Sequence, residues 1–280
     1  MGAAGEEGFL SPMELSVVVP LFNEAENLEP LCREILAALE PTGLAYELIL
    51  VDDGSRDDSF GRLAALAAGD GRIKVIRLRR NFGQTAAMAA GFDAARGDVI
   101  VPMDGDLQND PADIPRLLEK IREGYDVVSG WRKNRQDTLI SRRLPSVLAN
   151  ALISRMTGVR LNDYGCTLKA YRRDVLQQVN LYGELHRFVP ALASQVGAHL
   201  AEVPVNHRPR RAGSSKYGID RTLRVILDLI TVKFLLRYAT RPMQLFGKWA
   251  AVTFLCAGLT GASTLYMKIF EGLSMNRNPL

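Results

Sequence analysis

The chain has 280 residues, a length that suits one large domain with an appendage. Its apolar content of 47% and charged content of 24% are those of a globular protein, and a net charge of +4 does not indicate nucleic-acid binding. The three cysteines, at positions 32, 166 and 256, are odd in number and lack metal-ligand spacing. We therefore expect free thiols in a reducing compartment and no disulfide framework.

Residues 1–13 contain no apolar core, so they do not form a signal peptide, and we expect a disordered leader. Beyond them, apolar strands alternate with helices. The expected strands span residues 15–19, 47–51, 73–78, 99–103, 125–131 and 167–171, and the expected helices span 26–39, 58–68, 84–95, 111–123 and 144–156. This alternation predicts an α/β fold with a doubly wound, mostly parallel sheet. Glycine-rich dinucleotide and P-loop motifs are absent, which disfavours those chemistries.

The segment VIVPMDGDLQ at 99–108 combines a buried strand with two carboxylates one residue apart, Asp104 and Asp106. Ligands of open α/β sheets bind at the carboxyl edge, where these residues lie. Two close carboxylates repel each other unless a cation separates them, and a hard divalent ion with substrate phosphates would supply that charge. Gln108 offers a carbonyl oxygen to the same ion. The alternative is a solvated turn, because Asp-Gly is common in turns.

Two earlier strands also end in polar residues. Asn23 and Glu24 follow the first strand, and Asp52 and Asp53 follow the second, where they could accept hydrogen bonds from a base or ribose. Capping of the next helix by Ser55 or Asp57 is the structural alternative. Three acidic loops on one edge favour a binding site.

Basic residues gather in two later segments. Residues 132–135 and 142–143 carry a dense basic run that is either a solvated face or a cradle for an anion. Residues 207–217 place four cations among glycine and serine, which is typical of a mobile lid over phosphate oxygens. The histidines at 186, 199 and 207 share no ligand spacing, and we interpret each as structural or solvated.

The C-terminal part changes character. Residues 221–240 are helical and apolar with charges on opposite sides, which predicts a bend near Thr231 or two segments lying on a membrane surface. Residues 249–270 carry a single charge, Lys268, and are long enough to cross a bilayer core. Arg241 and Lys248 place the N-terminal side of this helix in the cytoplasm, and small residues at 257–263 suit packing against another helix. A buried hairpin of a soluble protein is the alternative.

Together the motifs resemble family 2 glycosyltransferases of the GT-A fold, and more closely the polyprenyl-phosphate sugar transferases, the group of dolichyl-phosphate mannose synthase and the undecaprenyl-phosphate aminoarabinose and glucose transferases. The segments that carry the resemblance are VPLFNE at 19–24, VDDGS at 51–55, NFGQ at 81–84, MDGDLQ at 103–108, DYGC at 163–166 and GSSKY at 213–217. The ordered set is far more specific than any one motif.

The resemblance implies a role for each matched residue. The nucleotide sugar would bind to Pro20, Asn23, Glu24, Asp52, Asp53, Asp104, Arg210 and Lys216; the metal, Mg²⁺ or Mn²⁺, to Asp104, Asp106 and Gln108; and the lipid phosphate to Arg132 and Arg143. Asp163 occupies the position proposed as the base, and Asp106 and Lys216 complete the catalytic set. Because a phosphate monoester has its second pKa at about 6, we expect Asp163 to orient the substrates as much as to remove a proton.

The implied activity is metal-dependent, inverting transfer of a sugar from a UDP- or GDP-type donor to a polyprenyl phosphate at the cytoplasmic face of the inner membrane. The domains would be a catalytic domain at 14–218, interfacial helices at 219–247, a transmembrane helix at 248–272 and a tail, in a chain that could form a homo-oligomer. Relatives of this kind usually carry a second membrane helix, which would begin about where this sequence stops. Two alternatives stay open: a family 2 enzyme acting on a saccharide or protein acceptor, and a non-enzymatic membrane scaffold.

Overall fold

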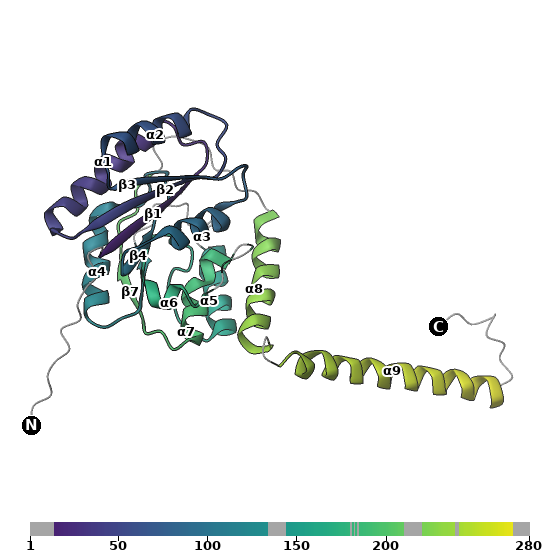
Figure 1. The fold of residues 1–280 in the computed structure, drawn as a ribbon. Coiled ribbons are helices and arrows are strands. Elements are labelled where there is room, and N and C mark those ends of the chain that lie inside the picture. Colours follow the sequence, from purple (N-terminus) through teal and green to yellow (C-terminus); the bar gives the residue numbers. More distant parts are fainter. Residues whose placement is uncertain are drawn as a thin grey trace, which may run out of the picture. The chain divides into compact units, whose positions relative to one another are not determined.

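A seven-stranded mixed sheet organises the part of the chain that the computed structural model describes, residues 14–133, 144–179, 181, 183, 185–209, 220–238 and 241–270. Its strands, in the order β3-β2-β1-β4-β6-β5-β7, are β1 (Leu15–Leu21), β2 (Tyr46–Asp52), β3 (Ile73–Arg77), β4 (Val99–Pro102), β5 (Val127–Trp131), β6 (Lys169–Arg172) and β7 (Leu200–Pro204) (Figure 1). The six predicted strands are confirmed, with boundaries that agree within two residues.

Strand directions confirm a mostly parallel sheet. β1 pairs in parallel with β2 and β4, β2 with β3, and β5 with β7, whereas β6 runs antiparallel between β4 and β5. Central strands β1 and β2 are buried almost throughout, as strands covered on both faces must be. β7 was not predicted, because an edge strand is only half-buried and its sequence contains Glu202.

Helices cover both faces of the sheet, which gives two apolar cores (Figure 1). On one face lie α1 (Leu28–Leu39), α2 (Ser59–Gly69) and α4 (Ile114–Arg122), and on the other α3 (Gln84–Ala94), α6 (Arg173–Leu176) and α7 (Val189–Gln195). α1 shows the sequence logic: Leu28, Leu31, Ile35 and Leu39 recur at helical spacing and are fully buried. Three short 3-10 helices, η1 (Glu40–Thr42), η2 (Pro111–Asp113) and η4 (Leu185–Phe188), and the longer helix α5 (Leu144–Thr157) complete this part of the fold.

The C-terminal part holds two long helices, α8 (Asp220–Tyr238) and α9 (Pro242–Phe270). α8 continues without interruption through Thr231 and ends at Tyr238, and the expected bend near Thr231 stays a prediction. By its internal contacts the chain divides into two units, Met1–Val232 and Lys233–Leu280. Within the first unit α8 buries Leu229, whereas Leu227 and Ile230 are exposed.

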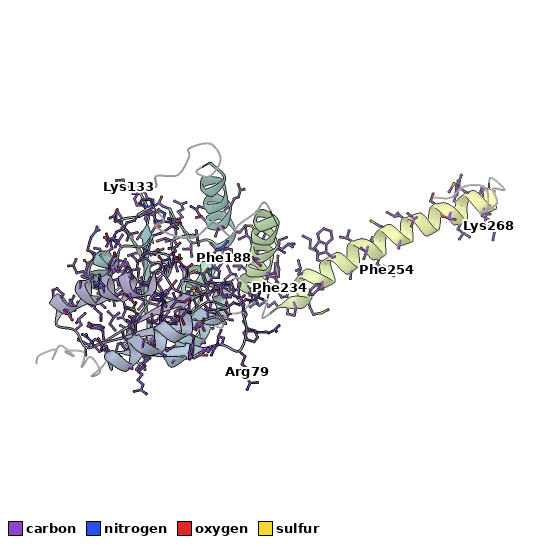
Figure 2. All side chains as sticks on the ribbon, turned by 90° about the horizontal axis from the view of Figure 1, so that it is seen from above. Arg79, Lys133, Phe188, Phe234, Phe254 and Lys268 are labelled. Carbon is purple, nitrogen blue, oxygen red and sulfur yellow. The ribbon has the colours of Figure 1, made fainter. Side chains whose placement is uncertain are left out.

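α9 is long and apolar enough to cross a membrane. It begins at Pro242, before the predicted start at residue 249, and its most apolar stretch has a mean hydropathy of 1.4. Its large side chains point outward, as Phe254 does in Figure 2, where Lys268 lies near the C-terminal end of the helix. At ~1.5 Å per residue the helix exceeds the ~30 Å thickness of a bilayer core.

Candidate functional site

The carboxyl ends of β1, β2 and β4 are neighbours, so the polar loops that follow them meet at one edge of the sheet. Leu21 at the end of β1 pairs with Asp52 at the end of β2, and Val18 pairs with Pro102 at the end of β4. Pro20 lies inside β1 at this edge and is half-buried. This arrangement unites the predicted residues of the three loops.

The loop after β1 is tied to the loop after β2 through Asn23. This residue has a φ of 55°, a left-handed conformation that asparagine tolerates better than most residues. Its N–H donates to Ser55 Oγ at 2.9 Å, and its Oδ1 accepts the N–H of Arg56 at 2.8 Å. Ser55 therefore binds Asn23 and does not cap α2, whereas Asp57 Oδ1 accepts the N–H of Ser59, the first residue of α2, at 3.1 Å. Glu24 accepts a hydrogen bond from Asn27 Nδ2 at 2.6 Å.

Asp52, the last residue of β2, and Asp53, which follows it, fix the backbone of the loops at this edge of the sheet. Asp53 accepts the N–H groups of Phe82 and Gly83 at 2.8 and 2.9 Å, which fixes the loop before α3. Asp52 is fully buried, and its Oδ1 accepts the N–H of Ser55 at 2.9 Å. A Cβ added at Gly54 would lie 2.4 Å from the backbone of the loop after β3, so only glycine permits this close approach. Nucleotide contact by these acids stays a prediction.

Asp104 stands at the end of β4 between two side-chain donors. Gln84 Nε2 donates to its Oδ1 at 2.8 Å, and Thr167 Oγ1 donates to its Oδ2 at 2.7 Å. Burial raises the pKa of Asp104, and the neighbouring charge of Asp106 raises it further. The charge of Asp106 therefore acts on Asp104 in the direction that the sequence predicted. Thr167 was missed as a partner because it lies 63 residues away in sequence.

The rest of the loop after β4 has an unusual backbone. Leu107 has a φ of 62°, which is costly for a leucine, and its side chain is buried in the core. Asp106 Oδ1 accepts the N–H of Gln108 at 3.2 Å, and the Gln108 carbonyl accepts the N–H of Arg208 at 2.9 Å. Arg208 Nη2 also lies 2.6 Å from Asp110 Oδ1, so Arg208 binds the loop after β4 through both its backbone and its side chain.

These residues suit a hard divalent ion. Asp104, Asp106 and Gln108 contribute oxygen atoms from one short loop, and oxygen atoms are the ligands that hard divalent ions take. Among the described residues, no three side chains of histidine, cysteine, aspartate or glutamate converge as a complete metal cage. Carboxylate and amide oxygens suit Mg²⁺ or Mn²⁺, which fill their remaining positions with phosphate oxygens and water.

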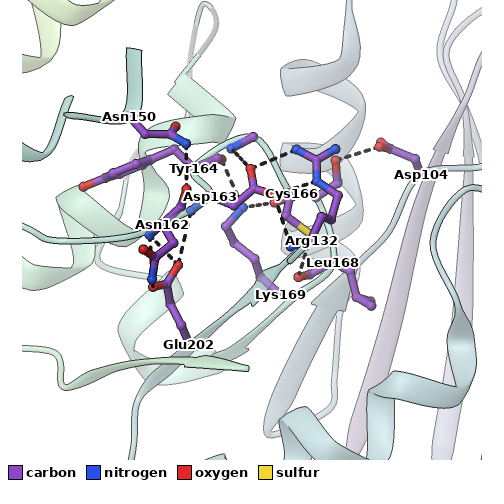
Figure 3. Close-up of polar contacts among 12 residues, drawn as sticks. Asp104, Arg132, Asn150, Asn162, Asp163, Tyr164, Cys166, Leu168, Lys169 and Glu202 are labelled. Carbon is purple, nitrogen blue, oxygen red and sulfur yellow. Dashed lines mark hydrogen bonds and ion pairs between the residues drawn. The ribbon is translucent and has the colours of Figure 1, made fainter. Parts of the chain in front are cut away.

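A second charged pair, Arg132 and Asp163, lies beside this loop (Figure 3). Arg132 Nε donates to Asp163 Oδ2 at 2.6 Å and Nη2 donates to Oδ1 at 2.9 Å, a bidentate fork between two residues that follow β5 and precede β6. Asp163 is 3% exposed and also accepts the N–H of Gly165 at 3.1 Å. Burial lowers the pKa of Arg132, but Asp163 outweighs this effect and keeps it charged.

Three predicted residues lie outside the described part of the chain: Arg143, Arg210 and Lys216. Their assignments stay predictions. The resemblance placed Arg132 and Asp163 in separate roles, and the structure joins them as one ion pair.

Comparisons with known proteins agree with this geometry. Residues 16–179 match the family described as glycosyl transferase family 2. A dodecaprenyl-phosphate galacturonate synthase of Rhizobium johnstonii is 50% identical over 84% of this chain and 71% of its own length. An undecaprenyl-phosphate 4-deoxy-4-formamido-L-arabinose transferase of Shewanella sediminis is 46% identical over 78% of this chain and 66% of its own length. This chain thus spans about two thirds of the length of the second relative.

The fold also occurs in solved structures. Glucosyl-3-phosphoglycerate synthase from Mycobacterium tuberculosis, in complex with Mn²⁺ and UDP-glucose, has a TM-score of 0.60 and 20% identity over 80% of this chain and 78% of that one. Its complex with Mg²⁺ and UDP has a TM-score of 0.58 and 21% identity over 80% of this chain and 79% of that one. The predicted GT-A fold is confirmed by this likeness.

Proposed function

Because the chain belongs to glycosyl transferase family 2, we propose that it moves a sugar from a nucleoside-diphosphate sugar to a polyprenyl phosphate. Two relatives, at 50% and 46% identity, are named for transfer to dodecaprenyl and undecaprenyl phosphate. One structural observation carries the proposal: a guanidinium held by a buried carboxylate lies beside the acidic loop. An anionic acceptor and a metal-bound anionic donor would need these two adjoining charged sites.

The donor would lie over the carboxyl edge of β1, β2 and β4. Its diphosphate would face Asp104, Asp106 and Gln108, with the divalent ion as the Lewis acid that offsets charge on the leaving diphosphate. UDP is the nucleotide we favour, since the structures of similar fold hold UDP. Arg210 and Lys216, in a segment outside the described residues, would add positive charge on the same diphosphate.

In this proposal Arg132 would bind the acceptor phosphate. Its Nε and Nη2 donate to Asp163, and among the described residues Nη1 makes no hydrogen bond. A guanidinium has five N–H donors, so the same group can bind Asp163 on one edge and a phosphate on another. The phosphate oxygen would then attack the anomeric carbon from the face opposite the diphosphate, which inverts its configuration.

Asp163 acts in this scheme by fixing Arg132. Both of its oxygens already accept hydrogen bonds, from Arg132 and from the N–H of Gly165. A phosphate monoester with a second pKa of about 6 is mostly dianionic near neutral pH, so it needs no strong base to become a nucleophile. Orientation by Asp163 is therefore sufficient.

The membrane would supply the lipid acceptor. α9 is long enough to span a bilayer, and the exposed Leu227 and Ile230 of α8 suit a membrane surface. We place the catalytic unit at the cytoplasmic face of the inner membrane, on the basis of Arg241 and Lys248 at the N-terminal side of the spanning segment. The predicted division into catalytic, interfacial and spanning parts belongs to this proposal.

The test uses the full chain in detergent with undecaprenyl phosphate and a panel of UDP-sugars, including UDP-galacturonic acid and UDP-4-deoxy-4-formamido-L-arabinose, with and without EDTA. We expect metal-dependent formation of one sugar-phosphate lipid. Transfer to saccharides in the absence of a lipid phosphate would instead support an enzyme with a saccharide acceptor. Failure to bind any nucleotide sugar would support the scaffold alternative.

A further inference from the structure

Three polar residues form a row across the sheet beneath the segment that carries Asp163. Ser129 of β5 pairs with Lys169 of β6 on one side and with Glu202 of β7 on the other. Directly paired residues point to the same face of a sheet. Lys169 and Glu202, of opposite charge, are therefore directed to the same side, where residues 162–166 lie (Figure 3).

Glu202 binds the start of that segment. Its carboxylate accepts the N–H of Asn162 at 2.8 Å, the N–H of Asp163 at 3.3 Å and the side-chain Nδ2 of Asn162 at 2.8 Å. An anion is thus set against N–H groups, which carry partial positive charge. Hydrogen bonds to a charged group are about twice as strong as those between neutral groups.

Lys169 binds the end of the same segment. It is 2% exposed, and its ammonium donates to the carbonyl of Tyr164 at 3.4 Å and to the carbonyl of Cys166. A cation is thus set against carbonyl groups, which carry partial negative charge. An ammonium is costly to bury, so its location here requires such acceptors. Burial lowers the pKa of Lys169, and the charge of nearby Asp163 opposes this effect.

The segment between these two charges makes one contact of the proposed site and leads directly into a second. Asp163, inside the segment, accepts two hydrogen bonds from the side chain of Arg132. Thr167, just after the segment, donates a hydrogen bond to Asp104. We propose that Glu202 and Lys169 form a two-charge clamp on residues 162–166, and that this clamp positions the Arg132–Asp163 pair for the acceptor phosphate. The second half of this statement rests on the proposed function; the clamp itself does not. Glu202 and Lys169 are thus positioning residues that act through Asp163.

The clamp is tested first in the free enzyme, by amide hydrogen exchange of the peptide that spans residues 160–168. The variants are Lys169→Met, which keeps the length of the side chain without its charge, and Glu202→Gln, which keeps one oxygen. The matched control is Lys74→Met, which breaks the ion pair of Lys74 with the buried Glu47 at the opposite end of the strands. We expect exchange in this peptide to rise about tenfold in both clamp variants and to stay unchanged in the control.

Unchanged exchange in both clamp variants would overturn the clamp, whether or not the enzyme transfers sugar to a lipid. If Lys169→Met does not fold, Glu202→Gln decides the result alone, because its change lies at the half-buried edge strand β7. A wild-type enzyme that transfers no sugar to a prenyl phosphate would refute the proposed function and leave the exchange result valid.

Kinetics then test the positioning role. We expect kcat/KM for the prenyl phosphate to fall by about 10- to 100-fold in Lys169→Met and in Glu202→Gln, a loss typical of removing a residue that orients a binding side chain. The KM of the nucleotide-sugar donor should stay nearly unchanged. Lys169→Arg, which keeps the charge, should restore most of the activity. Equal loss toward donor and acceptor, or a lower melting temperature with unchanged kinetics as expected of Lys74→Met, would overturn the positioning role.

Discussion

Replacing Asp163 with asparagine removes one charge from a buried pair and leaves the size of the side chain nearly unchanged. Both carboxylate oxygens accept hydrogen bonds from Arg132, at 2.6 and 2.9 Å. Asparagine keeps one acceptor and turns an amide N–H₂ toward a donor. The fork is lost, and the guanidinium of Arg132 is left buried without a counter-charge.

The size of the effect follows from this burial. The side chains of Arg132 and Asp163 are only 15% and 4% exposed, so water screens the pair weakly. Removing one partner of a buried ion pair costs about 3–5 kcal/mol. If all of that loss appears in binding of the acceptor and the transition state, kcat/KM for the prenyl phosphate falls by about 140- to 4,000-fold, since ~1.4 kcal/mol corresponds to a factor of ten. Any part of this free-energy loss that destabilises the folded protein lowers the melting temperature instead.

The assay measures kcat/KM for the prenyl phosphate in Asp163→Asn and wild type across about pH 6 to 9, a range in which the acceptor becomes fully dianionic. We expect the ratio of the two enzymes to be constant, because orientation does not depend on hydroxide. If kcat/KM of Asp163→Asn instead recovered toward the wild-type value by about tenfold for each unit of rising pH, Asp163 would act by removing a proton, and the reasoning would be refuted.

A double variant supplies the control. With Arg132→Met added to Asp163→Asn, no buried charge remains unpaired, so the combined loss should be smaller than the sum of the single losses. Additive losses would show that the two side chains act independently.

Three further outcomes follow. Chelation by EDTA, and Asp106→Asn at limiting Mn²⁺, should each weaken UDP binding by at least about tenfold in calorimetry, because a carboxylate ligand is lost; equal affinity with and without EDTA would contradict the metal site. Leu107 has a φ of 62° and a buried side chain, so Leu107→Gly and Leu107→Ala both lower the melting temperature, but alanine should be worse by about 1 kcal/mol because it keeps the backbone strain; the reverse order would argue against strain. Burial raises the pKa of Glu47, yet hydrogen bonds from Lys74 and Ser16 outweigh it and hold that pKa below its ordinary value. A lowered pKa contributes stability above the unfolded pKa and loses it as the pH falls through the folded pKa, so Glu47→Gln should lower the melting temperature at neutral pH and match wild type in acid; a gap independent of pH would contradict this.

Local patterns were enough to predict most of the elements. Strands β1 and β2 are mostly apolar, and the buried leucines and isoleucine of α1 recur at helical spacing. Burial on both faces of a strand, or on one side of a helix, thus shows in residues that are close in the sequence. β7 left no such mark, since an edge strand needs few apolar residues. Charges on opposite sides of α8 do not break the helix, which is continuous from Asp220 to Tyr238.

The acidic loops could likewise be placed from sequence, because parallel strands deliver their carboxyl ends to one edge. The partners of those acids could not. Gln84 and Thr167 flank Asp104 from 20 and 63 residues away, and only the strand order brings them there.

By itself, the sequence determined the α/β class, the acidic loops at one sheet edge and an apolar helix long enough for a membrane, since each depends on residues close together in the chain. The tertiary structure alone decided that Arg132 and Asp163, 31 residues apart, form one buried pair. It also decided that Glu202 and Lys169 grip the same segment. Those contacts exist because β6 runs antiparallel between β4 and β5 with β7 beside them, and no local pattern records which distant strand becomes a neighbour.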